Sequence, residues 1–486
     1  MMIRAILALL LALLAASSVG RLAGYPSRPR WKGLAHCLLA LCLVLALPAM
    51  RCAWAGLQPP AASSARGRVE PDALTLEAAV QEALQANPGI QAIMHDAAAA
   101  LRRVDASRGQ RYGELDALLT AQHFSYPQLL QPLAGPVTPA AIGSLPFAQD
   151  QLHVGGIYTY PLYVGGRIVN QIRIAELGAD KGNALLTGTR SDVTYNVTAL
   201  FVQAQALEAQ ADALQREIDS LEVTRQNLEL ALKIGRAPEV DLLKVLDRIS
   251  EAEAARMNAL AQRQRLLAAL MSLLGRDPAQ TPTLAPLPDH LPELAVGKQE
   301  MRSSAIRRSS VRAAELSAAQ GERQIGVARS ALGPTVSVQA SYLQNADLSS
   351  LDISDDTWSI GVQVAAPIFD GGSRRADLSR SREEARALQQ RAVAARLEAI
   401  ADLEGALASW QSAQDQLRAA DAQYNSAHEV ARIEQVRFDT GAGDIEDLLR
   451  ARSRETAAQS TQIAARAQII VSGAQINRAT ESEAAR

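Results

Sequence analysis

The sequence predicts a mainly α-helical protein that also supplies the strands of a β-barrel in a membrane, with this arrangement built twice within one chain. Ala, Leu, Gln, Arg and Glu dominate the 486 residues and only 4% are aromatic, a composition typical of long helices. The second observation is an internal repeat. The third is a set of four segments with alternating apolar and polar residues, each long enough to cross a bilayer. The formal net charge of −2 gives no support for a nucleic-acid partner.

The internal repeat rests on landmarks that keep one spacing over most of the chain. Residues 160–167 (YPLYVGGR) correspond to residues 366–373 (APIFDGGS), and each motif is followed by a long helical pattern. A spacing of 206 residues separates three landmark pairs: Pro161 and Pro367, Gly235 and Gly441, and Asp241 and Asp447. Chance does not preserve a register through a long helix, so the pattern indicates a duplicated strand–helix unit.

The first element in chain order is a targeting segment over residues 1–55. Basic residues precede an apolar run at 34–50, and Ala53-Trp54-Ala55 places small residues at −3 and −1 of a cleavage site before Gly56. This is the pattern of a secretory signal peptide. An earlier apolar run at 6–16 leaves a transmembrane anchor as the alternative, although both runs are shorter than the ~20 residues of a spanning helix.

All three cysteines, Cys37, Cys42 and Cys52, lie inside this segment. We therefore expect a mature chain that has no cysteine and needs no disulfide. Arg51 and Leu41 stand where a lipid-anchor site needs a small residue before the cysteine, so we also expect no lipid anchor. The residues that follow, 56–72, are rich in Pro, Ala and Ser and are expected to be a mobile leader.

The helices are expected to form two long antiparallel arrangements. A helix at 74–107 has Thr75 as its expected N-cap and is interrupted at Pro88. The two long helices, 167–232 and 373–438, would each extend ~100 Å at 1.5 Å per residue. Beyond each tip glycine the chain returns in shorter helices. We expect these to stack in pairs, 239–274 with 301–331 around a Pro-rich equatorial segment at 275–292, and 444–476 with 74–107.

Four strands are expected, at 115–124, 151–162, 335–343 and 358–368. A membrane barrel cannot have open edges, and closing one takes at least ~8 strands. Four strands must therefore combine with those of other copies, and a trimer would supply twelve. The resulting domain division is a first repeat at 73–292 with its hairpin at 167–274, a second repeat at 293–481 with its hairpin at 373–476, and a tail at 482–486.

These motifs, present twice and in register, resemble those of the TolC family of outer-membrane efflux proteins, also called outer membrane factors, over residues 74–480. The resemblance implies a homotrimer in the outer membrane, with a twelve-stranded β-barrel continued by a periplasmic α-helical barrel. It implies an exit duct that works with a periplasmic adaptor (a membrane fusion protein) and an inner-membrane ABC transporter or RND pump.

Within that family the chain is most similar to CyaE-type exporters of type I secretion, which implies export of a protein toxin such as an adenylate cyclase-hemolysin. The missing lipid-anchor cysteine agrees with this. Two alternatives remain open. One is a duct for small molecules or drugs, and the other is a non-channel periplasmic helical adaptor.

The candidate site residues fall into three groups. The first is expected to form the turns between strands and helices, because proline cannot continue a strand ladder and paired glycines re-aim the backbone: Pro161, Gly165, Gly166, Pro367, Gly371 and Gly372. The second forms the hairpin tips, where Gly235 and Gly441 end helices. The resemblance implies that an adaptor docks on the tip residues Ile234, Gly235, Arg236, Thr440, Gly441 and Ala442.

The third group lies about two turns beyond the tips and comprises Asp241, Asp447, Arg450 and Lys244. The resemblance implies that these two acids line the periplasmic mouth. In a trimer they would form rings of negative charge there, a common way to select cations. Arg450 could latch this periplasmic aperture by pairing with an aspartate of a neighbouring hairpin. The alternative is that these are ordinary solvated helix residues.

The sequence contains no pattern of catalytic residues. The histidines are scattered without the spacing of metal ligands, and no nucleophile motif is present. We therefore expect neither an enzyme nor a cofactor.

Overall fold

The structure is a computed structural model, and it describes residues 73–130, 145–286, 293–294, 296–349 and 352–482. The expected signal peptide, its cleavage site between Ala55 and Gly56, the upstream apolar run and the leader all lie outside these residues. So do residues 287–292 of the expected Pro-rich segment.

The chain divides into two compact units, which are described separately. The described residues of the first fall in Leu118–Gly155 and Tyr342–Thr357, and those of the second fall in Val69–Ala117, Gly156–Ser341 and Trp358–Arg486. Within the described residues, the second unit contains the helices and one end of each strand.

The strands form one four-stranded sheet in the order β1-β2-β3-β4. Their bounds are β1 Glu114–Leu129, β2 Phe147–Tyr163, β3 Thr335–Asp347 and β4 Asp352–Ala365. They contain 16, 17, 13 and 14 residues, which is longer than the expected strands of about ten that would suffice to cross a bilayer. The fourth strand ends three residues before the expected position 368.

Pro161 lies inside β2 rather than at its end, so the expectation that it stops the strand is wrong. A Cβ on Gly113, which precedes β1, would lie 3.0 Å from the Cα of Tyr160. Beyond Tyr160, β2 therefore has no ladder partner on its β1 side, where a missing N–H is tolerated. Pro367 does lie outside β4, two residues after its end.

The two long helices are α5 (Arg167–Lys233) and α9 (Ser373–Asp439), and each contains 67 residues. Each follows a pair of glycines with positive φ: 61° and 80° at Gly165 and Gly166, and 66° and 88° at Gly371 and Gly372. Residues with a Cβ rarely adopt this left-handed backbone. The glycine pairs thus form the turns that lead from β2 into α5 and from β4 into α9.

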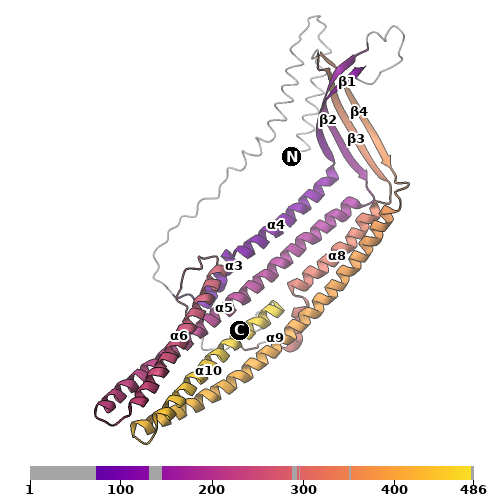
Figure 1. The fold of residues 1–486 in the computed structure, drawn as a ribbon. Coiled ribbons are helices and arrows are strands. Elements are labelled where there is room, and N and C mark those ends of the chain that lie inside the picture. The colour runs from indigo at the N-terminus through magenta and orange to yellow at the C-terminus, as the bar shows by residue number, and fades with distance from the viewer. Residues whose placement is uncertain (1–72, 131–144, 287–292, 295, 350–351, 483–486) are drawn as a thin grey trace. The chain divides into compact units, whose positions relative to one another are not determined.

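Shorter helices complete the second unit, as Figure 1 shows. They are α3 (Leu76–Ala86), α4 (Pro88–Gly109), a 3₁₀ turn η1 (Gln110–Tyr112), α6 (Glu239–Leu273), α7 (Lys298–Ile306), α8 (Ser309–Ser330) and α10 (Ile445–Thr480). Thr75 caps α3 as expected, since its hydroxyl accepts a hydrogen bond from the Ala78 amide at 3.2 Å. The expected helix at 301–331 is instead two helices, which are separated by Arg307 and Arg308.

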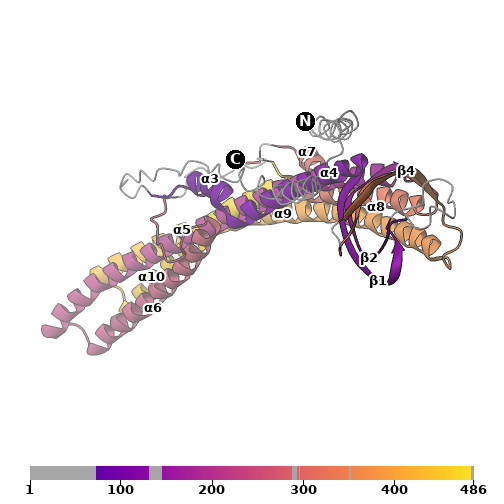
Figure 2. The ribbon, with the colours of Figure 1, turned by 90° about the horizontal axis from the view of Figure 1, so that it is seen from above.

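The half-length helices do not stack in the expected pairs. Helix α8 packs between α5 and α9, and so does α10, which Figures 1 and 2 both show beside α5. The end of α10 meets the start of α8, so these two form one column between the long helices. On the other side of α5, α6 meets α4. The expected pairing of 239–274 with 301–331, and of 444–476 with 74–107, is therefore wrong.

One side chain bridges the two helices at each of these junctions. The buried Asn87 donates from Nδ2 to the carbonyl of Leu273 at the end of α6 (2.7 Å) and accepts from the amide of Ile90 in α4 (3.0 Å). At the other junction Glu481, just beyond α10, accepts from the Ser309 amide at the start of α8 (2.8 Å). Both side chains satisfy backbone groups that helix ends leave unpaired.

Replacing Asn87 with alanine is expected to lower the free energy of unfolding by about 1–3 kcal/mol, because buried backbone groups at two helix ends lose their partner. Denaturant titration of the detergent-solubilised protein, followed by circular dichroism, measures this. The matched control is Gln81→Ala, which removes an exposed amide from the neighbouring helix α3. Equal effects of the two substitutions would show that Asn87 does not join the helices.

The core is a series of apolar clusters between helices, not one central core. The largest clusters join α5 with α6 and α3, and α9 with α10 and α7. Leu74, before α3, also pairs with the Pro-rich segment, because its amide donates to Thr283 and its carbonyl accepts from Ala285, each at 2.8 Å. None of the helices in the described residues has the length and apolarity that a membrane-spanning helix needs.

Candidate functional site

The two hairpin tips have the same backbone geometry. At the end of α5 the amide of Gly235 donates to Leu232 (2.9 Å) and that of Arg236 donates to Ala231 (2.8 Å). At the end of α9 the corresponding bonds run from Gly441 to Phe438 (2.9 Å) and from Ala442 to Arg437 (2.8 Å). These are Schellman motifs, which require a left-handed residue after the helix. Gly235 and Gly441 supply it with φ of 73° and 75°.

The tip residues are exposed. Ile234 keeps 66% of its surface accessible, and Arg236, Thr440 and Ala442 are exposed as well. Within the described residues, nothing lies within 4 Å of the Cβ position at Gly235 or Gly441. Each tip therefore presents an apolar or small side chain and bare backbone to whatever approaches it.

An apolar cluster behind the tips holds the two hairpins together. It is formed by buried residues of α5, α6 and α10: Leu221, Leu228, Val245, Ile445 and Leu448. Ile445 and Leu448 are 1% exposed. They belong to residues 445–449 (IEDLL), the counterpart of residues 239–243 (EVDLL) in the first repeat. Ile445 and Leu448 pack against the other hairpin, while the two acidic residues between them remain exposed.

The ion pairs beyond the tips differ from the expectation for Arg450. Its guanidinium pairs within its own helix, with Glu446 at 2.8 Å and Asp447 at 3.6 Å. The pair that joins the hairpins is Lys244 of α6 with Glu446 of α10, at 3.6 Å. No partner for the Asp241 carboxylate lies among the described residues.

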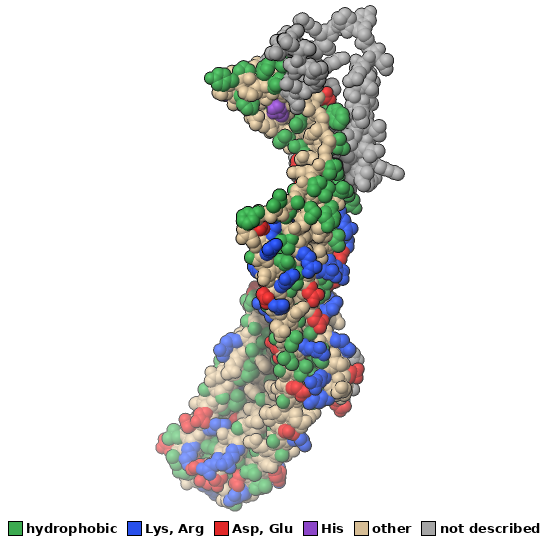
Figure 3. Space-filling view, turned by 90° about the vertical axis from the view of Figure 1, so that its right-hand side faces the viewer, with side chains coloured by type: hydrophobic (Ala, Val, Ile, Leu, Met, Phe, Trp, Pro, Cys, Tyr) green, Lys and Arg blue, Asp and Glu red, His purple; other side chains and the backbone are tan. Residues whose placement is uncertain are grey.

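Glu446 was not singled out from the sequence, although it stands next to Asp447 in the repeated motif. It accepts a hydrogen bond from Arg450 and forms an ion pair with Lys244, so it is the centre of a charge network that links the hairpins. Lys244 and Glu446 are 39% and 55% exposed, and an exposed pair contributes only ~0–1 kcal/mol. Figure 3 shows positive and negative side chains interspersed over the hairpin ends.

A more buried ion pair lies farther along the α5–α6 hairpin. Arg248 donates to Oε1 of Glu217 at 2.7 Å, and the Glu217 side chain is 2% exposed. Burial acts to lower the pKa of Arg248, but its hydrogen bonds to Glu217 and Glu251 outweigh this and raise the pKa above its usual value. Removing one partner would leave a buried charge, so this pair fixes α6 to α5.

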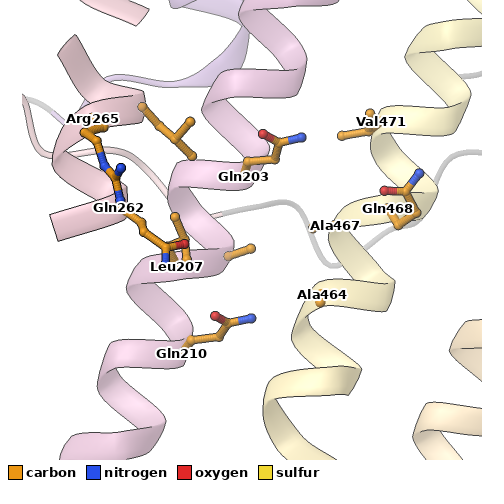
Figure 4. Close-up of a pocket in the computed structure, with 11 residues that line it drawn as sticks. Gln203, Leu207, Gln210, Gln262, Arg265, Ala464, Ala467, Gln468 and Val471 are labelled. Carbon is orange, nitrogen blue, oxygen red and sulfur yellow. The ribbon is translucent and has the colours of Figure 1, made fainter. Parts of the chain in front are cut away.

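A groove of about 620 Å³ lies between α5, α6 and α10. As Figure 4 shows, glutamine, arginine and apolar side chains from the three helices line it. Its polar residues are Gln203, Gln210, Gln262, Arg265 and Gln468. A second groove, of about 860 Å³, lies between α9 and α10 and is lined by Ala, Ser, Thr and Gln. Apart from Arg265, the polar side chains of both grooves are uncharged, and such surfaces suit contact with water or with another helix.

The turn into α9 contains a residue that the sequence reasoning missed. The Asp370 carboxylate accepts from the amides of Arg374 and Gly372, each at 3.0 Å. The amide of Arg374, followed by that of Gly372, holds the pKa of Asp370 below its usual value. The position that corresponds to it before α5 is Val164, so only one turn has this cap. The sequence signal that could have identified this cap is an acidic residue just before a helical pattern, because a negative charge is favourable at a helix N-terminus.

The described residues contain no group of three or more His, Cys, Asp and Glu side chains that could hold a metal ion. His123 and His153 hydrogen-bond to Asp150 and Asn345 at 2.6 and 2.7 Å respectively. The arrangement therefore offers exposed tips, a charge network and polar grooves.

Comparison with known proteins identifies a family and several relatives with similar sequences or structures. The family model described as "Outer membrane efflux protein" matches residues 79–276 and 301–480. Outer membrane protein OprJ of Pseudomonas aeruginosa is 29% identical over 214 residues, which are 43% of this chain and 44% of OprJ. Protein CyaE of Bordetella pertussis is 26% identical over 255 residues, which are 51% of this chain and 54% of CyaE.

The chain thus spans about half the length of these curated relatives. A solved structure of the outer-membrane channel OprN matches with a TM-score of 0.72 at 21% identity, and covers 83% of this chain and 89% of that one. This likeness shows a shared fold of strands and long helices. The protein is an outer-membrane protein, and the family model covers most of its length. The chain belongs to the outer membrane efflux protein family, the TolC-like family that its repeated motifs resemble.

Proposed function

We propose that the protein is the outer-membrane exit duct of a tripartite export system, assembled as a homotrimer. The observation that carries this proposal is the combination of two helical hairpins with a four-stranded sheet in one chain of the outer membrane efflux protein family. Four strands leave two open edges, and an open edge in lipid is too costly to persist. Three copies would close the sheet with twelve strands.

The internal duplication supports this assembly. Helices α5 and α9 have the same length, and the tips behind them have the same hydrogen bonds. Two repeats in each of three copies would give six similar hairpins around one axis. The long helices would then form the periplasmic wall, and the polar grooves beside α10 would lie between neighbouring helices of that wall.

We infer the partners from two features of the proposed duct. A passive duct does not itself supply the energy for export, and the exposed hairpin tips offer a surface on which another protein can dock. A passive duct has to be coupled to an inner-membrane ABC transporter or RND pump through a periplasmic adaptor. We place adaptor docking at the tip residues of both hairpins, Ile234 to Arg236 and Thr440 to Ala442. The periplasmic aperture would be lined by Asp241, Asp447, Lys244 and Arg450, together with Glu446.

Type I secretion of a protein is the cargo route that we propose, on the basis of the similarity to CyaE and of the expectation that the protein carries no lipid anchor. Small-molecule efflux is the second candidate, because the family description itself names efflux. Membership of an outer-membrane family leaves no support for the third alternative, a non-channel periplasmic adaptor.

A strain that lacks the gene tests the function and separates the two cargo classes. Protein secretion predicts that at least one large protein disappears from the medium and returns on complementation, while susceptibility to toxic small molecules stays unchanged. The reverse outcome would favour small-molecule efflux. A strain unchanged in both properties would contradict an export duct of either kind.

A further inference from the structure

The four junctions between strands and helices lie side by side at one end of the second unit. They are the segments that lead from α4 into β1, from β2 into α5, from α8 into β3 and from β4 into α9. The contacts that join neighbouring junctions are those of the Gly113 Cβ position with Tyr160, of the Gly165 Cβ position with Ser330, and of Thr335 with Ala365. The junctions therefore form one continuous row.

Positive charge is concentrated at this row. Four windows of 17 residues cover the junctions and the adjoining helix ends, and they contain twelve arginines and seven acidic residues, a net charge of +5. The windows are residues 100–116, 160–176, 321–337 and 366–382. The formal net charge of the whole chain is −2, so the residues outside the windows carry −7. Figure 3 shows Lys and Arg side chains gathered next to the apolar strand ends on one face of the molecule. The positive excess is therefore local to the junctions.

One arginine at each junction is exposed and has no partner in its own chain. The four are Arg111 in η1, Arg167 at the start of α5, Arg329 in the last turn of α8 and Arg375 in the first turn of α9. None of their guanidinium groups forms a hydrogen bond or an ion pair within the described residues. We call these four residues the arginine belt. Their charges are available to a group outside the chain.

Exposed aromatic side chains lie on the strand side of the arginine belt. Tyr112, Tyr163 and Phe369 are 68%, 53% and 91% exposed, and each is closer to a strand than the belt arginine of the same junction. Aromatic girdles mark the two interfaces of a membrane barrel, and their rings lie at the level of the lipid headgroups. The belt therefore lies at the depth where the sheet would leave the bilayer.

We propose that the arginine belt is a binding surface for anionic phospholipids in the leaflet from which the helices emerge. A guanidinium group binds phosphate oxygens through two parallel hydrogen bonds. Clustered basic residues at a membrane surface attract headgroups that carry a net negative charge. This inference rests on the proposed crossing of the outer membrane by the sheet, and it adds a lipid partner to the protein partners of the duct.

Assembly from identical copies cannot neutralise this surface. Ion pairs between copies would rearrange the charges, but each copy adds the same excess of +5, so a trimer would carry +15 around the base of its sheet. The simplest alternative is that the belt consists of ordinary solvated arginines, and that alternative predicts no excess of one sign at one level of the molecule. An anionic lipid fits both the charge of the belt and its position.

Lipid retention by the full-length protein tests this inference. The trimer is reconstituted in nanodiscs made of equal parts phosphatidylcholine and phosphatidylglycerol, and native mass spectrometry counts the lipids of each class that stay bound on release. We expect at least about threefold more phosphatidylglycerol than phosphatidylcholine on the native trimer. The excess should shrink as the salt concentration rises, because the attraction is electrostatic.

The belt variant replaces all four arginines and should bring the ratio of the two lipids to about one. Its substitutions are Arg111→Gln, Arg167→Gln, Arg329→Gln and Arg375→Gln. The corresponding lysine variant should retain most of the excess, because it keeps the charge and loses only the two-pronged hydrogen bonding. If the belt variant does not assemble, two double variants replace it, and each should lower the ratio: Arg111→Gln with Arg329→Gln, and Arg167→Gln with Arg375→Gln.

The matched control removes the same amount of charge away from the junctions. It replaces four exposed arginines of α5 and α10 that also form no ion pair within the described residues: Arg190→Gln, Arg216→Gln, Arg454→Gln and Arg466→Gln. This control should retain the native ratio of the two lipids. Equal ratios for the belt variant and the control would overturn the role of the belt.

The temperature at which the trimer dissociates on heating in the nanodisc is a second measurement. It should be higher with phosphatidylglycerol than with phosphatidylcholine alone, and the belt variant should lose this gain. If the belt variant lowers the temperature equally in both lipids, the arginines contact protein and the inference is overturned. Native trimers that conduct ions but show no lipid preference would also overturn it and leave the duct intact. Protein that forms neither trimers nor pores would instead contradict the proposed function.

Discussion

Replacing both tip glycines, Gly235→Leu with Gly441→Leu, is expected to reduce export at least tenfold while a native outer-membrane trimer still forms. A leucine cannot easily adopt φ near +75°, so both Schellman turns would be distorted and would carry a bulky side chain at the proposed docking surface. The turns lie at the far ends of α5 and α9 from the strands, ~100 Å along each helix. Export assays and cross-linking to the co-expressed adaptor measure the effect.

Two control variants separate docking from general damage. Gly405→Leu adds the same side chain to an exposed glycine within α9 that has open space around it, and it should export normally. Gly235→Asn with Gly441→Asn should retain most activity, since asparagine tolerates the left-handed conformation. Normal export by the double leucine variant would show that the tips are not the docking surface.

The second large effect is expected at the aperture. Glu446→Ala removes the partner of both Lys244 and Arg450, whereas Asp447→Ala removes one long ion pair. We therefore expect Glu446→Ala to raise the open probability in planar bilayers more than Asp447→Ala does. The exposed Lys244–Glu446 pair, which joins the hairpins, contributes ~0–1 kcal/mol. Three copies of it in the proposed trimer would give at most about 3 kcal/mol, or roughly a hundredfold in the ratio of closed to open states.

A charge exchange is the control for this prediction. Lys244→Glu with Glu446→Lys retains the pair in reverse and should close more often than either single variant. Removing the two acids of the proposed rings, Asp241→Ala with Asp447→Ala, should weaken cation preference. If the Glu446 variants and the double aspartate variant all match the native channel, these residues are ordinary solvated helix positions and the constriction lies elsewhere.

The features that the sequence predicted well are those for which one residue type is nearly obligatory. A left-handed turn after a helix requires glycine or asparagine, so Gly235 and Gly441 mark the tips without any knowledge of tertiary contacts. Thr75 is likewise a local cap, because its partner is three residues away. The ends of the long helices follow from the same local rules.

The features that the sequence did not predict depend on contacts between distant segments. No residue near the end of α6 in the sequence indicates that this helix meets α4. The junction depends on the hydrogen bond between Asn87 and Leu273, which are 186 positions apart. The break between α7 and α8 occurs at Arg307 and Arg308, where neither glycine nor proline marks it. Glu446 was missed because its role depends on Lys244, which lies on the other hairpin.

The most direct test of an outer-membrane duct is single-channel recording of the purified trimer in planar lipid bilayers. We expect discrete, cation-selective current steps from the native protein, with a low open probability that rises when Glu446 is replaced by alanine. A correctly assembled trimer that gives no current steps, both as the native protein and as the Glu446→Ala variant, would contradict the proposed duct.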